Sequence, residues 1–156
     1  MTTTGDEIQI VCFRVGSQEF GLNVFQVERI LRYEQPAALP KSPDYLEGVV
    51  TFEGISVPVI DLRKRLSLKA DLTEETRMMV LDIEGQRVGI VVDQVLDVAR
   101  VDGGAIAPPP PLVRGLAAEY ISGLLVREGE RTVVILNAGR LLSSKERLAL
   151  KSVGAA

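Results

Sequence analysis

The sequence predicts a mainly β protein built from two copies of one small barrel module. Three observations support this prediction: a hairpin with apolar cross-strand pairs, an internal repeat that relates the two halves, and hairpins where a parallel α/β sheet needs intervening helices. A chain of 156 residues is long enough for one compact unit or two small fused ones.

The hairpin lies in the stretch Glu47 to Leu66, EGVVTFEGISVPVIDLRKRL. A two-residue turn at Glu53-Gly54 makes two apolar pairs face each other, Phe52 with Ile55 and Val50 with Val57. We expect these pairs to lie on the buried side of the ribbon. This pattern indicates β structure and does not point to a catalytic or ligand-binding group.

Two residues after this turn add further expectations. Pro58 has no backbone N–H, so we expect it at a sheet edge or a bulge. Asp61 follows the apolar run and is a plausible cap for a helical turn at Leu62 to Leu66. Receiver domains also place an Asp at a strand end, but the hairpins here do not fit their parallel sheet.

The remaining elements follow from spacing and composition. A strand is expected from Ile8 to Val15, and the three-residue spacing from Val24 to Ile30 suggests a short helical turn. Asp102 to Pro111, DGGAIAPPPP, is expected to be a stiff connection. Ser143 and Glu146 have capping-box spacing, which predicts a C-terminal helix at about residues 138–151 packing back on a barrel.

The second half of the chain repeats the first. At an offset of 68 residues, Val15 to Ile30 (VGSQEFGLNVFQVERI) aligns with Ile83 to Val98 (IEGQRVGIVVDQVLDV). At an offset of 75, Tyr45, Gly48, Glu53 and Gly54 align with Tyr120, Gly123, Glu128 and Gly129, and one further residue aligns Asp61 with Asn137. We therefore predict two subdomains, residues 8–70 and 77–136, each closing a barrel that covers its edges.

The composition excludes most kinds of catalytic and metal-binding site. There is no His, and the single Cys12 lies in an alternating strand where a core role is expected. No zinc ligand set and no phosphate-binding glycine loop can be assembled, so we expect no metal and no cofactor. A net charge of −3 argues against nucleic-acid binding. With no signal peptide and no apolar run long enough to span a bilayer, we expect a cytoplasmic protein.

These motifs resemble those of the CheW family of chemotaxis coupling proteins, and the similarity runs from about Ile8 to Leu150. The most specific segment is GVVTFEGISVPVIDLRKRL, which is similar to the family pattern GVxNLRGxxxPVIDLRxRF. The pattern GIVVDxVxDV is matched by Gly89 to Val98, and the YxxGL step by Tyr120 to Leu124.

The resemblance implies two tandem five-stranded SH3-like β-barrels related by pseudo-two-fold symmetry, and no enzymatic activity. Its implied partners are the cytoplasmic tip of a methyl-accepting chemoreceptor and the regulatory domain of a CheA-type sensor histidine kinase. The protein would then be an adaptor at membrane-bound receptor arrays, without inserting into the membrane. Two alternatives stay open: a coupler of a non-flagellar pathway with surface-motility or second-messenger output, and a small ligand-binding regulatory barrel.

The chain departs from the family pattern where kinase and receptor contacts are expected. Thr51 and Glu53 stand where the family usually has Asn and Arg, and Arg29 stands where it often has Glu. The charge pair would be inverted and not lost, so we expect Arg29, Glu53 and Gly54 to belong to this interface. The alternative is that Glu53 is only a turn residue.

A coupler without a reactive group acts through its surface, so apolar side chains that a barrel cannot bury are candidates for contact. The repeated turns supply them: Val27 and Ile30 in the first copy, and Val92, Val95 and Val98 in the second. We expect these residues to line a groove between the modules that receives the helical tip of a receptor, with Val27 and Val95 closest to it. Core packing is the alternative for each.

Overall fold

The computed structural model describes residues 7–40, 46–65, 72–108, 120–142 and 146. These residues form two five-stranded sheets, which confirms the prediction of a mainly β fold. The strands are β1 (Glu7–Val15), β2 (Gln18–Asn23), β3 (Val27–Arg32), β4 (Leu46–Phe52), β5 (Ile55–Asp61), β6 (Arg77–Ile83), β7 (Gln86–Val92), β8 (Gln94–Asp102), β9 (Ile121–Arg127) and β10 (Arg131–Leu136). The helical segments are η1 (Val24–Gln26), α1 (Leu62–Arg65), η2 (Gly103–Ala105), η4 (Glu128–Glu130) and η5 (Ala138–Arg140).

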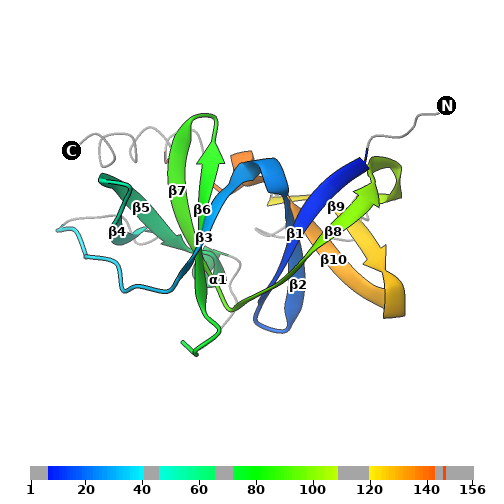
Figure 1. Ribbon diagram of the computed structural model, residues 1–156, viewed down its shortest axis with the longest axis horizontal. Helices are drawn as coiled ribbons and strands as arrows, with labels where there is room; N and C mark the ends of the chain where they lie inside the picture. The colour runs from blue at the N-terminus through cyan, green and yellow to red at the C-terminus, as the bar shows by residue number, and fades with distance from the viewer. Residues whose placement is uncertain (1–6, 41–45, 66–71, 109–119, 143–145, 147–156) are drawn as a thin grey trace.

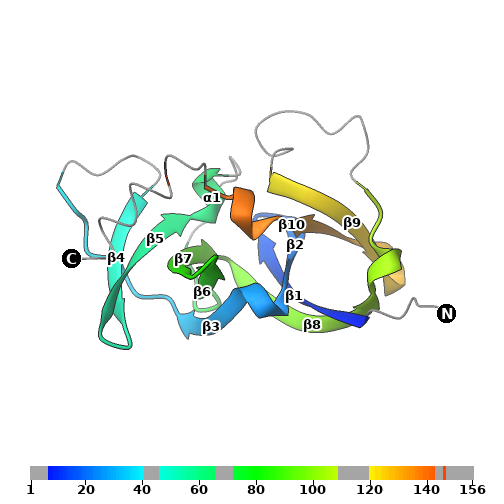
Figure 2. The same ribbon diagram turned by 90° about the horizontal axis from the view of Figure 1, so that it is seen from above.

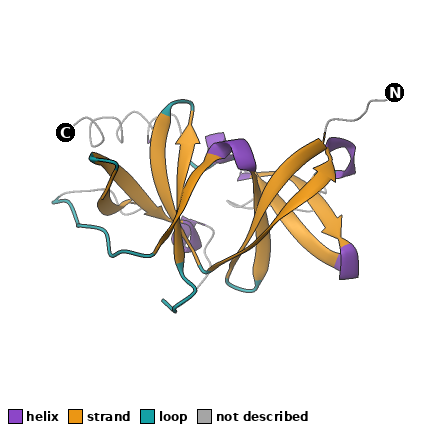
Figure 3. Ribbon diagram, in the orientation of Figure 1, coloured by secondary structure: helices purple, strands orange, loops and turns teal. Residues whose placement is uncertain are grey.

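Each sheet curls into a small barrel, and the two barrels lie side by side along the long axis of the molecule (Figures 1 and 2). Barrel A has the strand order β8-β1-β2-β10-β9, and barrel B has the order β3-β6-β7-β5-β4. Strands make up nearly all of both barrels, and the short helical segments lie at the strand ends (Figure 3). Among the described residues, no helix combines the length and hydrophobicity needed to cross a bilayer.

The sequence repeat appears in the structure as a repeat of strands, because β1 to β5 correspond in order to β6 to β10. When each strand of barrel B is replaced by its counterpart, the order becomes that of barrel A. The pairings agree as well: β10 runs parallel to β2, as β5 runs parallel to β7. The two barrels are therefore equivalent in topology.

The strands are distributed differently from the predicted subdomains, residues 8–70 and 77–136. Each barrel combines the first two strands of one copy with the last three strands of the other. The chain changes barrel at η1, which leads from β2 into β3, and again at Asp93, which leads from β7 into β8. The sequence repeat alone does not show whether each copy forms its own barrel or the copies exchange strands. Equivalent strands bury the same faces in both arrangements.

β4 and β5 form the predicted hairpin, with the register pairs Val50 to Val57 and Phe52 to Ile55. Glu53 and Gly54 have φ angles of 51° and 77°, the left-handed backbone of a tight hairpin turn. Val50, Val57 and Phe52 are buried as predicted. Ile55 is exposed, because it lies at the tip of the hairpin.

Pro58 lies at neither a sheet edge nor a bulge, because β5 is an inner strand of barrel B. It pairs with Val49 of β4, and the parallel pairing with β7 begins one residue later, at Val59. Pro58 therefore precedes the segment in which β5 has a neighbour on both sides, where a missing N–H would leave a ladder hydrogen bond unmade.

The predicted helical turns are mostly strand. Only Val24–Gln26 forms a 3-10 turn, whereas Val27 and Ile30 lie on β3, and Val95 and Val98 lie on β8. Three-residue spacing over so short a segment does not separate a helix from a strand. Of the predicted C-terminal helix, η5 and Glu146 are described, and most of the remainder lies outside the described residues.

Three apolar clusters hold the described residues together. One lies inside barrel A around Ile10 and Cys12, which confirms the predicted core role of Cys12, and one lies inside barrel B around Met78. The largest lies between the barrels and includes Phe13 of β1 and Met79 of β6. β1 and β6 therefore bury one face inside a barrel and the opposite face between the barrels, which explains the unbroken apolar runs Ile10–Phe13 and Met78–Leu81 at their centres.

Candidate functional site

The predicted groove residues lie on β3 and β8, which are edge strands of their sheets. Figures 1 and 2 place these two strands on the same side of the molecule, next to the junction of the barrels. Ile30 is 40% exposed and Val98, its counterpart in the repeat, is 50% exposed. Val27 and Val95 are partly buried against the cluster between the barrels.

Val92 does not belong to this surface, although it was predicted to line the groove. It ends β7 and is fully buried in the cluster between the barrels. A side chain in this position stabilises the junction of the barrels and is not accessible to a partner protein. Four of the five predicted groove residues therefore reach the surface, two of them exposed and two half-buried.

The predicted charge pair is present at the end of barrel B. Arg29 of β3 lies 3.8 Å from the Glu53 carboxylate in the turn between β4 and β5. The pair spans the gap between the two edge strands, β3 and β4, which we call the seam of barrel B. Gly54 completes the turn at this end.

Two residues that the sequence did not point to complete this surface. Arg87 of β7 donates two hydrogen bonds to Glu28, at 2.9 and 2.7 Å, and one to Glu53, at 3.0 Å. The hydrogen bond from Arg87 to Glu28 raises the pKa of the arginine. The guanidinium groups of Arg29 and Arg87 lie 5.7 and 5.2 Å from the centroid of the Phe52 ring. The seam of barrel B is therefore a neutral set of two acids and two bases around one aromatic ring.

No local signal links Arg87 to Glu53, because the pairing of β7 with β5, which brings β7 near the β4–β5 turn, joins segments far apart in the chain. Exposed ion pairs and exposed cation–π contacts of this kind contribute little to stability, because solvent screens the charges. Such contacts do not determine the stability of a barrel, but they hold the four charged side chains in one geometry at its surface. The seam therefore contributes little to the stability of barrel B.

The seam of barrel A, between β8 and β9, carries a corresponding pair with the charges in reversed order. Asp97, the counterpart of Arg29, accepts a hydrogen bond of 2.8 Å from Arg127, the counterpart of Phe52. This hydrogen bond is the main reason why the pKa of Asp97 is lowered. Arg127 also lies 3.6 Å from the Sγ atom of Cys12, whose pKa is raised chiefly by burial.

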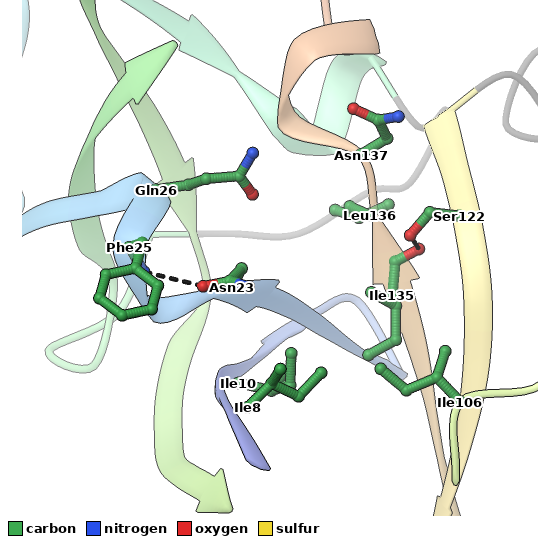
Figure 4. Close-up of a pocket in the computed structure, with 10 residues that line it drawn as sticks. All are labelled: Ile8, Ile10, Asn23, Phe25, Gln26, Ile106, Ser122, Ile135, Leu136 and Asn137. Carbon is green, nitrogen blue, oxygen red and sulfur yellow. Dashed lines mark hydrogen bonds between the residues drawn. The ribbon is translucent and has the colours of Figure 1, made fainter. Parts of the chain in front are cut away.

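A pocket of about 450 Å³ opens at one end of barrel A (Figure 4). Its lining is uncharged: Ile8, Ile10, Asn23, Phe25, Gln26, Ile106, Ser122, Ile135, Leu136 and Asn137. Asn23 caps η1 by accepting a hydrogen bond of 3.0 Å from the backbone N–H of Phe25, and the Phe25 side chain is 90% exposed at the rim. Without an acid, a base or a thiol, this lining offers surface for binding and no group for proton transfer.

Within the part of the chain that the structure describes, no group of three or more acidic or Cys side chains is arranged to hold a metal ion. What the surface offers is therefore apolar edge residues and two charged seams.

A protein-family model described as the CheW-like domain matches residues 9–146. The chain belongs to the CheW-like family. Chemotaxis protein CheW of Klebsiella aerogenes is 36% identical over 152 residues, covering 97% of this chain and 90% of that protein. Chemotaxis protein CheW of Treponema pallidum is 29% identical over 151 residues, covering 94% of this chain and 88% of that protein.

The fold agrees with this membership of the CheW-like family. The crystal structure of the scaffolding protein TtCheW from Thermoanaerobacter tengcongensis matches with a TM-score of 0.81 and 29% identity, covering 89% of this chain and 96% of that chain. Together these findings make the chain a chemotaxis coupling adaptor of the CheW-like family. They do not favour a small ligand-binding regulatory barrel. The groove and seam residues stay predictions.

Proposed function

We propose that this CheW-like protein links the cytoplasmic tip of chemoreceptors to the regulatory domain of a CheA-type histidine kinase. It would act by binding alone, at receptor arrays on the cytoplasmic side of the membrane, and would catalyse no reaction. The observation that carries the proposal is a pair of exposed apolar residues, Ile30 and Val98, on equivalent edge strands of a family member.

The receptor contact is assigned to β3 and β8. An isolated surface Ile or Val is ordinary, but here two such residues occur at repeat-equivalent positions beside the junction of the barrels. Val27 and Val95 lie beneath them, half-buried against the cluster between the barrels. An apolar stripe of a helical hairpin could cover all four residues at once, as in other helix-in-groove complexes.

The kinase contact is assigned to the seam of barrel B, through Arg29, Glu53 and Gly54. The arginines and acids there already satisfy each other at 3.0 and 3.8 Å, so a partner meets a neutral, ordered surface with Phe52 beneath. A kinase surface that suits this order of charges would be mismatched to the opposite order, because like charges brought together at an interface are costly. The inversion of Arg29 and Glu53 thus favours a cognate kinase with complementary changes.

The receptor contact can be tested with Ile30→Glu and Val98→Glu. Each should lower co-sedimentation with receptor-containing membranes by about tenfold or more, since a central apolar contact contributes over 1 kcal/mol. Melting temperature should change little, because both side chains are exposed. Val126→Glu is the matched control, since Val126 is 67% exposed on β9, outside the proposed groove. Wild-type binding by both groove variants would contradict the assignment.

A second measurement tests the coupling role itself. Kinase activity in receptor-containing membranes should depend on adding this chain, and the dependence should weaken for Ile30→Glu but not for Val126→Glu. If activity is the same with and without the wild-type chain, the protein does not couple that receptor and kinase.

A further inference from the structure

A buried ionic cluster lies where the two barrels meet, and neither the groove nor the seams use it. Arg63 of α1 donates a hydrogen bond of 2.9 Å to Oδ1 of Asp61 and one of 2.8 Å to Oδ2. Its other terminal nitrogen, Nη1, lies 3.5 Å from Oδ1 of Asp93. Both aspartates are almost fully buried, and the Arg63 side chain is 11% exposed. We call Asp61, Arg63 and Asp93 the junction cluster.

The junction cluster joins the two barrels. Asp61 is the last residue of β5 of barrel B and Arg63 lies in α1, which follows directly, whereas Asp93 lies between β7 of barrel B and β8 of barrel A. Oδ2 of Asp93 accepts a hydrogen bond of 2.6 Å from the backbone N–H of Gly16, in the β1–β2 turn of barrel A. The Asp93 backbone N–H also donates to the Arg14 carbonyl, at 2.9 Å. Asp93 is thus held from both barrels at once.

The other copy of the repeat shows that the fold does not require these charges. Asn137 stands at the position of Asp61 and makes the same cap, since its Oδ1 accepts from the Gly139 N–H at 3.0 Å as Asp61 accepts from the Arg63 N–H at 2.9 Å. Gly139 stands at the position of Arg63 and has no side chain, and Phe25 stands at the position of Asp93. In that copy Asn137 and Phe25 line the uncharged pocket of Figure 4.

The side-chain cap at Asp61 and Asn137 is therefore common to both copies. The ion pairs of Arg63 with Asp61 and Asp93 have no equivalent in the other copy. A buried charge that loses its partner is strongly unfavourable, so the cluster restricts the barrels to orientations that keep Asp93 within reach of both Arg63 and Gly16. Asp93 immediately precedes β8, which carries Val95 and Val98. Any rotation of one barrel against the other would move β8 relative to β3.

We propose that the junction cluster sets the spacing of β3 and β8 and thereby positions the receptor groove. Arg63 and Asp93 are then positioning residues that influence receptor binding without contacting the receptor. This inference rests on the proposed receptor-binding function of that groove. Kinase binding at the seam of barrel B should be unaffected, because all residues assigned to that seam belong to barrel B.

The test uses Asp93→Asn in the full chain. Asparagine keeps the size and an acceptor for the Gly16 N–H but removes the charge that faces Arg63. Spin labels on introduced cysteines at Thr51 of barrel B and Thr132 of barrel A, both exposed, report the distance between the barrels. We expect a broader distance distribution and receptor binding weakened about tenfold, within the usual range of coupling between sites. Kinase binding should stay within twofold of wild type. Asp82→Asn is the matched control, because Asp82 also accepts a backbone hydrogen bond, from Gly85 at 2.7 Å, but is exposed beside the β6–β7 turn of barrel B and outside the junction cluster; it should change neither the distances nor receptor binding.

An unchanged distance distribution together with wild-type receptor affinity would overturn the inference. If Asp93→Asn does not fold, Arg63→Lys replaces it, because lysine keeps the charge but not the paired hydrogen bonds to Asp61. The same broadening and selective loss of receptor binding are expected, and their absence counts against the inference. If the wild-type chain itself does not bind receptor, the proposed function fails, and the distance measurement still decides whether the cluster fixes the barrels.

Discussion

Barrel A and barrel B share one strand order, yet their seams are closed by side chains of opposite charge order. Arg29 of barrel B corresponds to Asp97 of barrel A, and Phe52 corresponds to Arg127. Each seam has an acid and an arginine in contact across the edge strands. The fold therefore needs compatible side chains at this place and leaves the direction of the charge pair free to serve recognition.

The interiors of the barrels are more alike than their surfaces. Ile10 inside barrel A and Met78 inside barrel B occupy equivalent positions, and both are almost fully buried. The glycine equivalents Gly48 and Gly123 each approach the backbone of a preceding loop residue. These shared features carry the stability, so the predictions that test the equivalence of the barrels have the largest expected effects.

The largest effects are expected for Ile10→Ala and Met78→Ala. Each leaves a cavity in one barrel, and truncation of a buried Ile or Met costs about 2 to 5 kcal/mol. Urea unfolding should give similar losses for both variants and one cooperative transition, because the cluster between the barrels joins them. Two separate transitions would show instead that the barrels unfold independently.

A smaller difference is expected between Gly48→Ala and Gly123→Ala. Gly48 has a φ angle of 145°, and an added Cβ would overlap the carbonyl of Ala37. At Gly123 the added Cβ would lie 2.8 Å from the Ala107 carbonyl oxygen and 2.6 Å from a side-chain atom of Ile106, which can move. Both should be destabilised, with Gly48→Ala worse by about 1 to 2 kcal/mol because of its backbone conformation. Equal losses of stability would mean that the close approach to the neighbouring backbone, and not the φ angle of Gly48, causes the destabilisation.

The seam of barrel B should show coupling in a double-mutant cycle. Arg29→Glu brings a second acid to Glu53 and should weaken kinase binding, and adding Glu53→Arg should restore part of it. Restoration stays partial because Arg87, 3.0 Å from Glu53, would then face a like charge. Stability should change by only about 0 to 1 kcal/mol in each variant. Strict additivity of the binding changes would show that the two residues act separately.

The smallest effect concerns acid sensitivity of the seam of barrel A. The hydrogen bond from Arg127 lowers the pKa of Asp97, so the folded state binds this proton less readily than the unfolded state. The resulting stabilisation is present at neutral pH and is lost as the pH falls below about 4. The Asp97→Asn variant should therefore lose less stability than wild type between pH 7 and pH 3 in urea unfolding. Since Asp97 is 41% exposed, the difference should be below about 1 kcal/mol.

Much of the fold could be predicted because its signals are local. The turn at Glu53-Gly54 and the pairs around it follow from a period of two and from glycine at a left-handed position. The alignment of the two halves covered four of the five equivalent strand pairs, β2 with β7, β3 with β8, β4 with β9 and β5 with β10. The caps at Asp61 and Asn137 follow from side chains that accept hydrogen bonds from nearby backbone N–H groups.

The candidate site was less accessible to such reasoning. The pair of Arg29 and Glu53 was found from a departure at two motif positions, and its contact is present at 3.8 Å. Val92 was misplaced, because an apolar residue at the end of a strand looks the same whether it faces solvent or the junction of the barrels. Arg87 and Glu28 were missed, because β7 and β3 are not even neighbours in their sheet.

The residues alone were enough to predict two copies of one β unit, the hairpin turn at Glu53-Gly54 and the cap at Asp61. Three features became visible only in three dimensions: the exchange of strands between the copies, the place of Ile30 and Val98 on two edge strands, and the contacts of Asp93 with Arg63 and the β1–β2 turn. Alternation and capping act over a few residues, so they are the same in either arrangement of the strands. The choice of barrel partner depends on contacts between segments far apart in the chain, which no local pattern records.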